Sequence, residues 1–249
     1  GMVMSQSGAG KFSATELNKQ LAGKSAWAST AVAAYEHAIN AGGSPKDIET
    51  ILQLVYLNFT SPRFNETDLN NLKNMYGPYF ANMEQDPNYI CSKELQKTLF
   101  NNHYRQQITS AAQIEALNIS TLQSVHSQLY GYADDFRFVI VGNIDLDTLK
   151  PLVEKYIGSL PTSKKVEYAV VDDGVRTVEG EVTNDFRTPM QQPKVSVRLN
   201  YTGAIEDNAK NRLIVNLWGR ALDARYMVSI REEKGGTYGV GVSGSIDKY

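Results

Sequence analysis

Two side chains near the end of the sequence, Arg231 and Tyr238, have the chemistry to bind a peptide carbonyl group. An arginine offers five fixed N–H donors and a tyrosine one hydroxyl, and such donors can stabilise an oxyanion as it develops. Arg231 is predicted at the end of a helix, and Gly235-Gly236 permits a reversal into a strand that Tyr238 begins. Both side chains can therefore reach one cleft.

The same residues also fit a purely structural role. Tyr238 would share one face of its strand with Val240 and Val242 and would pack in the core. Arg231 would complement the partial negative charge at the helix end. The residues alone favour this packing role over the binding role.

Zinc ligands at the spacing of a catalytic motif are missing from the sequence. Such motifs place their ligands as closely as His-Glu-x-x-His on one helix. His37, His103 and His126 lie far apart in the sequence and are expected to be surface or lightly packed residues. No residue is therefore assigned to a metal, and no Ser/His/Asp or paired-carboxylate arrangement indicates an unrelated small-molecule enzyme.

Two glycine-rich stretches match nucleotide-binding loops only superficially. The dinucleotide fingerprint must follow a strand and open a helix, whereas the glycines of residues 239–244 alternate within a predicted strand. Residues 7–11 lack the spacing of a phosphate loop and the Ser or Thr after its lysine. No cofactor is predicted. The alternating glycines instead leave one strand face bare, which an extended peptide can approach.

Composition and charge exclude several classes of partner. The 249 residues are 42% apolar and 21% charged, which is an ordinary balance for a soluble protein with a real core. With 25 basic and 27 acidic side chains and no long run of like charge, no nucleic-acid footprint is present. The most apolar windows are far shorter than the about 20 residues of a membrane span. The single cysteine, Cys91, excludes an intramolecular disulfide.

The N-terminal part is predicted to be rich in helices. Ser13 and Glu16 form a capping-box pattern that opens a short helix ending at Gly23. Helical periodicity and flanking breakers predict further helices over residues 44–61, 66–83, 90–101 and 120–129. Residues 25–40 fit neither the helical nor the strand period cleanly, so both assignments stay open on the residues alone.

Strands and helices alternate in the remainder. Residues 136–141 are rich in β-formers, and Asp145 begins a helix that runs to about Tyr156. Alternation of apolar and polar residues predicts strands over residues 175–182, 194–201 and 237–246, and helical periodicity predicts a long helix over residues 213–226. The polar, proline-bearing joint at residues 160–165 predicts two domains, residues 1–165 and residues 166–249.

Three stretches together resemble the insulinase/pitrilysin zinc metallopeptidases, and the C-terminal half of bacterial members in particular. The first carries Arg231 and Tyr238 seven residues apart, in Arg-Glu-Glu-Lys-Gly-Gly-Thr-Tyr. The second is Leu-Gln-Leu-Val-Tyr-Leu-Asn-Phe-Thr-Ser-Pro-Arg at residues 52–63. The third runs from Ala133 through Phe-Arg-Phe-Val-Ile-Val-Gly-Asn to Leu160-Pro161. The three lie in family order and cover most of the chain.

This resemblance implies an α+β fold of two consecutive metallopeptidase-like domains, each a mainly antiparallel sheet backed by helices. It also implies that residues 25–40 are strand-like. Family members close like a clamshell around an unfolded peptide, with zinc in one half only. The zinc-bearing half is expected on the same chain or on a partner subunit, and bacterial relatives suggest a periplasmic or cell-envelope location.

The resemblance also implies roles for particular residues. Arg231 would hold the substrate near the scissile bond, and Tyr238 would hydrogen-bond the carbonyl oxygen as it becomes tetrahedral. Zinc in the partner half would activate the attacking water, with a glutamate of that half as the base. The residues around Tyr238 that are expected to line the bound peptide are Gly236, Thr237, Gly239 and Gly241.

Two departures from the family pattern matter, and the first favours a non-catalytic half. Catalytic halves carry a ligand glutamate on a later helix, but the comparable stretch here, residues 71–79, has none. The chain is also expected to be a fragment truncated at both ends. The main hypothesis is a peptide-binding half that supports the transition state and is inert alone. The alternative is a catalytically dead scaffold subunit of the same fold.

Overall fold

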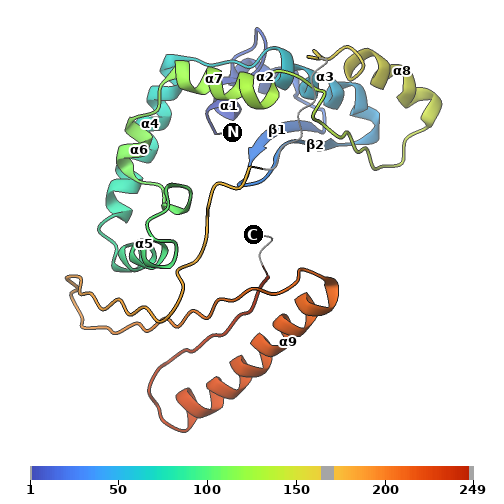
Figure 1. Cartoon of the computed structure of the whole chain (residues 1–249). Coiled ribbons are helices and arrows are strands. Elements are labelled where there is room, and N and C mark those ends of the chain that lie inside the picture. The colour runs from blue at the N-terminus through green and yellow to red at the C-terminus, as the bar shows by residue number, and fades with distance from the viewer. Residues whose placement is uncertain (1, 164–170, 247–249) are drawn as a thin grey trace. The chain divides into compact units, whose positions relative to one another are not determined.

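The computed structural model describes residues 2–163 and 171–246, which form two units. The first unit comprises residues 1–97 and 102–173, and the second comprises residues 98–101 and 174–249. The fold is α+β, with several helices and a small antiparallel sheet in the first unit (Figure 1). The predicted domain boundary after residue 165 falls in residues 164–170, outside the described residues.

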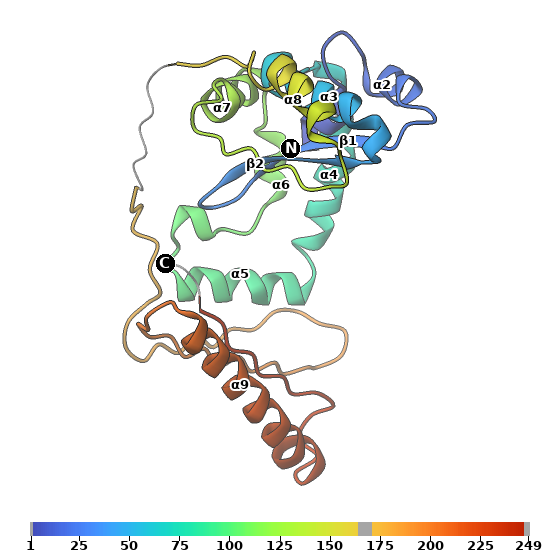
Figure 2. The ribbon, with the colours of Figure 1, turned by 90° about the vertical axis from the view of Figure 1, so that its right-hand side faces the viewer.

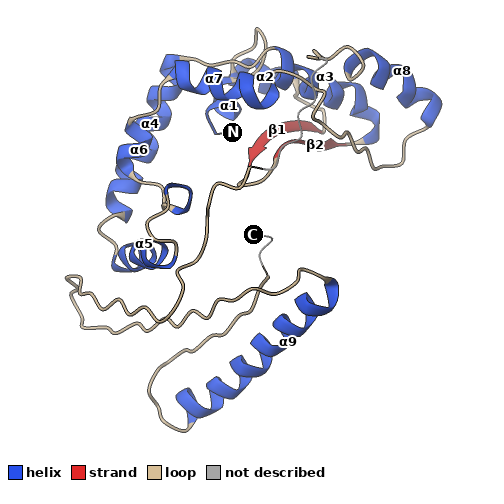
Figure 3. Ribbon diagram, in the orientation of Figure 1, coloured by secondary structure: helices blue, strands red, loops and turns tan. Residues whose placement is uncertain are grey.

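The sheet of the first unit is a hairpin of two strands, β1 (Ala26–Val32) and β2 (His37–Gly43). They pair antiparallel with Ala26 opposite Gly43 and Val32 opposite His37. The strand assignment that the resemblance implied for residues 25–40 is therefore confirmed. Helix α3 (Ile48–Thr60) packs against both strands (Figure 3).

Most predicted helices of the first unit form at the predicted places. The capping box of Ser13 and Glu16 closes with reciprocal hydrogen bonds at the start of α2. The helix predicted from Ser44 begins as a short 3-10 turn, η1, and continues as α3. Confirmed helices with their bounds are α2 (Ala14–Gln20), η1 (Pro45–Asp47), α4 (Glu66–Met83), α5 (Pro87–Leu99), α7 (Ile119–Tyr130) and α8 (Leu146–Tyr156).

Three short elements were not predicted. They are α1 (Met2–Ser7), η2 (Tyr104–Gln106) and α6 (Ala111–Glu115). The start of α6 carries a usable signal, because Ser110 and Gln113 form a second capping box. Helix α1 supplies the buried Val3, which packs with Leu69 and Leu72 of α4 and so ties the N-terminal residues to the core.

A second apolar cluster packs against the hairpin and contains several aromatic rings. Phe59 of α3 and Tyr130 of α7 are its buried centre, and the ring of Phe136 lies 4.8 Å from that of Phe59. The Tyr130 hydroxyl donates to the backbone oxygens of Ala31 and Ala38, at 2.8 and 3.3 Å. One side chain thus fastens α7 to both strands of the hairpin.

His126 corrects the expectation of a surface or lightly packed histidine. It is buried on α7, between the rings of Phe64 and Tyr130. Its Nε2 lies 2.8 Å from the backbone oxygen of Asn58, which can only accept, so this nitrogen carries the proton. Burial disfavours the charged ring and lowers the pKa of His126, although the bond to Asn58 acts in the opposite direction.

The strand prediction for residues 136–141 is wrong, because this segment pairs with no other strand among the described residues. Phe136 and Phe138 point their rings at Phe59, so aromatic packing holds the segment in place of a hydrogen-bond ladder. The polar joint that follows α8 is anchored to the same region. Ala133 donates to the backbone oxygen of Pro161 at 2.9 Å.

The second unit is built on one long helix, α9 (Ala209–Tyr226), which confirms the helix predicted over residues 213–226. It continues into a π-helical turn, η3 (Met227–Glu232). The three strands predicted at residues 175–182, 194–201 and 237–246 are wrong, since these segments pair with no strand among the described residues and the first and third contain bends, at Gly180 and Tyr238. Val178 donates its backbone N–H to Leu99 and Val242 to the Asp223 side chain, so these groups do not join a ladder.

Candidate functional site

Arg231 lies where α9 ends and the chain reverses. In the π-helical turn the N–H of Glu233 donates to the oxygen of Val228 at 2.9 Å, a five-residue step that widens the helix. The N–H groups of Gly235 and Gly236 then bond back into the last turn at 3.1 Å each. Gly235 has a φ of 59°, a left-handed conformation that glycine adopts without strain.

The guanidinium of Arg231 is exposed and largely uncommitted. Its Nη1 approaches the sulfur of Met227, a weak acceptor, at 3.5 Å. Within residues 171–246 no carboxylate pairs with it. Most of its donors therefore remain available for a ligand.

Tyr238 is fully solvent-exposed, with 100% of its surface accessible. The packing role, in which Tyr238 would enter the core beside Val240 and Val242, is therefore wrong. The hydroxyl makes no hydrogen bond to any described residue. Thr237 forms a tight turn ahead of it, since its hydroxyl donates to the backbone oxygen of Gly239 at 2.9 Å. Arg231 and Tyr238 thus flank one reversal, each with free hydrogen-bonding capacity.

The segment after Tyr238 returns along α9 (Figure 2). The N–H of Val242 donates to Oδ1 of Asp223 at 2.8 Å. A Cβ at Gly219 would lie 2.8 Å from the nitrogen of Gly244, so the glycine permits close backbone contact. Sequence reasoning missed Asp223 and Gly219, although a glycine inside a helix was a signal for such an approach. Gly244, one of the alternating glycines expected to face a peptide, packs against Val215 of α9.

The glycines predicted to line a peptide are in more open surroundings. A Cβ at Gly239 would meet no atom within 4 Å, and one at Gly241 would lie 3.9 Å from Oδ1 of Asp223. Gly236 lies inside the reversal, where a Cβ would be 3.7 Å from the oxygen of Ile230. The described residues thus bring Gly236, Thr237, Gly239 and Gly241 together around Tyr238, along one short stretch.

Metal-binding groups do not converge in the described part of the chain. No cluster of three or more His, Cys, Asp or Glu side chains is present in residues 2–163 and 171–246. His103, for instance, has its Nε2 3.1 Å from the backbone oxygen of Asp173. That aspartate pairs at 2.5 Å with the side chain of Arg105, which leaves an ion pair in place of a metal site.

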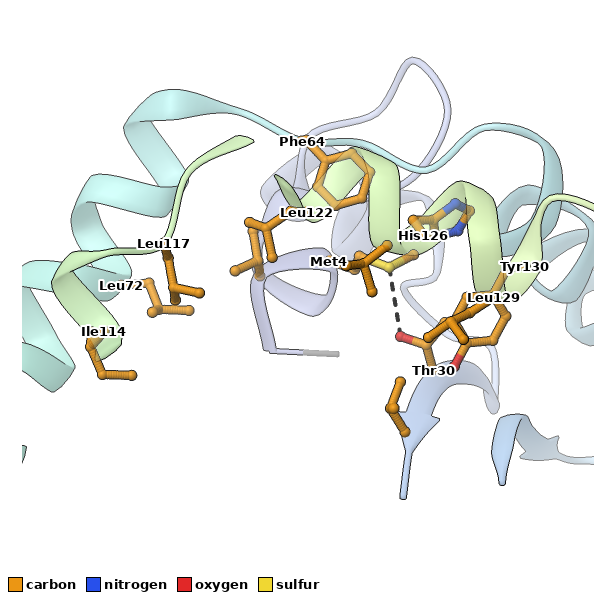
Figure 4. Close-up of a pocket in the computed structure, with 13 residues that line it drawn as sticks. Met4, Thr30, Phe64, Leu72, Ile114, Leu117, Leu122, His126, Leu129 and Tyr130 are labelled. Carbon is orange, nitrogen blue, oxygen red and sulfur yellow. Dashed lines mark hydrogen bonds between the residues drawn. The ribbon is translucent and has the colours of Figure 1, made fainter. Parts of the chain in front are cut away.

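The first unit contains an apolar cavity of about 220 Å³ between α1, β1, α4, α6 and α7 (Figure 4). Leu72, Leu122 and Leu129 line it, and Thr30 and His126 are among its few polar groups. The hydroxyl of Thr30 donates to the sulfur of Met4 at 3.6 Å. Such a lining can take apolar groups but offers no convergent catalytic side chains. None of the helices in the described residues is both long and apolar enough to cross a membrane.

Comparisons with known proteins identify a family and several relatives. Residues 116–248 match the family profile described as the peptidase M16 inactive domain. The chain is 25% identical over 246 residues to the probable zinc protease PqqL of Escherichia coli, which covers 98% of this chain and 26% of that protein. The chain thus spans about a quarter of the length of this relative.

Solved structures show the same fold. The crystal structure of the periplasmic protease PqqL from Escherichia coli matches 99% of this chain and 27% of its own, with a TM-score of 0.76 and 22% identity. The peptidase M16 inactive domain from Pseudomonas fluorescens matches 67% of this chain and 42% of its own, with a TM-score of 0.52 and 21% identity.

Proposed function

Because the chain belongs to the peptidase M16 family, as part of its inactive domain, we propose that it is the non-catalytic half of a zinc metallopeptidase. It binds the peptide substrate and supports the transition state, while a second half carries the zinc. The expected insulinase/pitrilysin-type family is confirmed, and relatives are named zinc proteases. Two consecutive M16-like domains and a clamshell closing around the peptide belong to this proposal.

The exposed pair of Arg231 and Tyr238 carries the proposal. Both side chains present unpaired donors from one helix reversal, so both can donate to a bound peptide. The guanidinium holds a backbone carbonyl of the substrate close to the scissile bond. The Tyr238 hydroxyl donates to the scissile carbonyl oxygen, and this bond strengthens as negative charge develops there.

The turn around Tyr238 supplies the backbone surface for the peptide. Gly236, Gly239 and Gly241 leave room for an extended chain to approach closely, and the turn made by Thr237 fixes the direction in which Tyr238 leaves the backbone. The zinc of the other half supplies an activated water nucleophile. The residues of this chain hold and polarise the carbonyl that the water attacks.

The cellular location of the protein is also part of the proposal, and it is inferred from a similar protein. The structurally similar Escherichia coli protein is described as a periplasmic protease. We place the protein in the periplasm or cell envelope on this basis.

Peptide hydrolysis by the full-length gene product tests the function. Activity is measured with and without a zinc chelator, beside the same assay on this 249-residue chain alone. The proposal expects activity that chelation abolishes in the full protein and none in the isolated chain. A full-length protein that holds no zinc and hydrolyses nothing, yet binds peptides or a protein partner, would establish the scaffold role instead.

A further inference from the structure

We propose that Asp223 is a positioning residue for Tyr238, because it sets the register in which the segment carrying Tyr238 lies on α9. The inference rests on the proposed function of Tyr238 as a group that contacts the substrate. It adds a residue that neither the family match nor the sequence motif singles out.

Val215, Gly219 and Asp223 lie on one face of α9, because they are spaced four residues apart. The returning segment meets them in reverse order. Oδ1 of Asp223 accepts from the N–H of Val242 at 2.8 Å, and a Cβ at Gly219 would lie 2.8 Å from the nitrogen of Gly244. A Cβ at Gly244 would in turn lie 2.7 Å from the backbone oxygen of Val215. Helix and segment are therefore in close antiparallel contact.

The contacts differ in what they determine. Gly219 and Gly244 allow the two backbones to come close, and only a glycine fits at this approach, but they make no hydrogen bond that selects one amide of the segment. The hydrogen bond of Asp223 is directional and charge-assisted, and it selects one particular amide of the segment. Asp223 is partly buried, where such a bond is less weakened by water than at the open surface.

The register matters because Tyr238 lies four residues before Val242. A slip of one residue moves an extended chain by about 3.3 Å and turns each side chain to the opposite side. Arg231 follows Asp223 by about two helical turns on the same continuous helix. The anchor at Asp223 therefore limits where Tyr238 can lie relative to Arg231.

Kinetics of the full-length protein test this role with three variants. Asp223→Ala removes the acceptor and keeps a good helix former, whereas Asp223→Asn keeps an Oδ1 acceptor. Asn216→Leu, at an exposed position of the same helix, is the control. We expect Asp223→Ala to lower kcat about ten- to a hundredfold with KM and zinc content little changed, because misplacement of about 1 Å has effects of this size. Asp223→Asn should restore most of the loss, and the control should keep wild-type kinetics.

Hydrogen exchange provides a readout that does not depend on activity. In the wild type, Asp223→Asn and Asn216→Leu proteins, mass spectrometry should find one slowly exchanging amide in peptide 240–246, that of Val242. In Asp223→Ala the same peptide should exchange faster, while peptides of the first unit stay unchanged. A peptide 240–246 that exchanges freely in the wild type, or equally in all four proteins, would overturn the register role.

A double variant distinguishes the positioning role of Asp223 from the proposed substrate contact of Tyr238. If Asp223 acts through Tyr238, adding Asp223→Ala to Tyr238→Phe should lower kcat no further. If the kcat of the double variant falls by the product of the two single losses, the positioning role is overturned, while the role of Tyr238 stays intact. If Tyr238→Phe alone leaves kcat unchanged, the proposed function of Tyr238 fails, and the positioning role fails with it. The exchange data then still decide whether Asp223 holds the segment.

Discussion

At the scale of single residues, Tyr238 should act on one kinetic constant only. Its hydroxyl is free in the unbound protein and strengthens its bond only as charge develops on the substrate oxygen. Tyr238→Phe in the full-length enzyme is expected to lower kcat by about a hundred- to a thousandfold and to change KM little. Steady-state kinetics on one defined peptide measure both constants. A wild-type kcat in the phenylalanine variant would remove Tyr238 from the mechanism.

Buried His126 should make the first unit sensitive to acid. Burial lowers its pKa in the folded protein below the ordinary value near 6.5. Above that value both states are neutral and the folded state is not penalised. As the pH falls below it the unfolded chain takes up a proton that the folded protein refuses, so stability decreases until the lowered pKa is reached.

Urea unfolding at pH 7.5 and pH 5 measures this effect. His126→Gln is the control, because its amide can still donate to the Asn58 oxygen and does not titrate. The wild type should lose more stability between the two pH values than the glutamine variant. Equal losses would show that His126 contributes nothing to the acid sensitivity.

At the scale of elements, local signals in the sequence were sufficient for most helices. Caps such as Ser13 with Glu16, and Asp145 ahead of α8, satisfy backbone groups within a few residues, so their effect is visible in the sequence. Strands need partners distant in sequence, and residues 136–141 show how such a prediction fails. Their aromatic side chains have the composition of a strand but pack against Phe59 without pairing.

Only part of the candidate site could be predicted, because the rest depends on contacts between residues distant in the sequence. The exposure of Tyr238 and the anchor at Asp223 depend on how the segment lies against α9, which no local pattern states. The resemblance pointed to Arg231 and Tyr238, while the residues alone favoured packing. The buried position of His126 likewise required knowledge of the neighbouring helices.

The packing of α4 against α1 and α6 offers a direct stability test. Leu72 of α4 is only 2% exposed and lines the apolar cavity. Leu72→Ala should lower the free energy of unfolding by about 2–5 kcal/mol, because it removes buried methyl groups and enlarges a void. The matched control is Leu146→Ala in the first turn of α8, where the leucine is 75% exposed and the loss should stay below about 0.5 kcal/mol. Equal effects in a urea titration would contradict this account of the core.

At the scale of the whole molecule, the two units differ in how much apolar surface they bury. Both apolar clusters lie in the first unit, and Val175 has the one buried apolar side chain among residues 98–101 and 174–246 of the second. Val195, Val197 and Leu199 are 88%, 77% and 74% exposed, although they alternate as strand residues do. Burial of apolar surface drives folding, so the second unit should be much the less stable when isolated.

Hydrogen exchange on the isolated chain and on the full-length protein tests this difference. Amides of residues 174–246 should exchange much faster than those of α3, α4 and α7 in the isolated chain. They should gain protection in the full-length protein, because the proposed function places a second half of the peptidase beside this one. Equal protection of residues 174–246 in both proteins would show that the second unit is stable without that additional chain.

The short strip of residues 98–101 has an evolutionary consequence. It sits within the sequence of the first unit but belongs structurally to the second, where Leu99 accepts from Val178 and Thr98 from Asn184. Recombination that exchanged only the part from residue 174 onward would separate that part from these partners. A replacement segment from another gene would have to form the same hydrogen bonds with residues 98–101 of this protein. We therefore expect the two units to have been inherited together, and not shuffled as independent modules between genes.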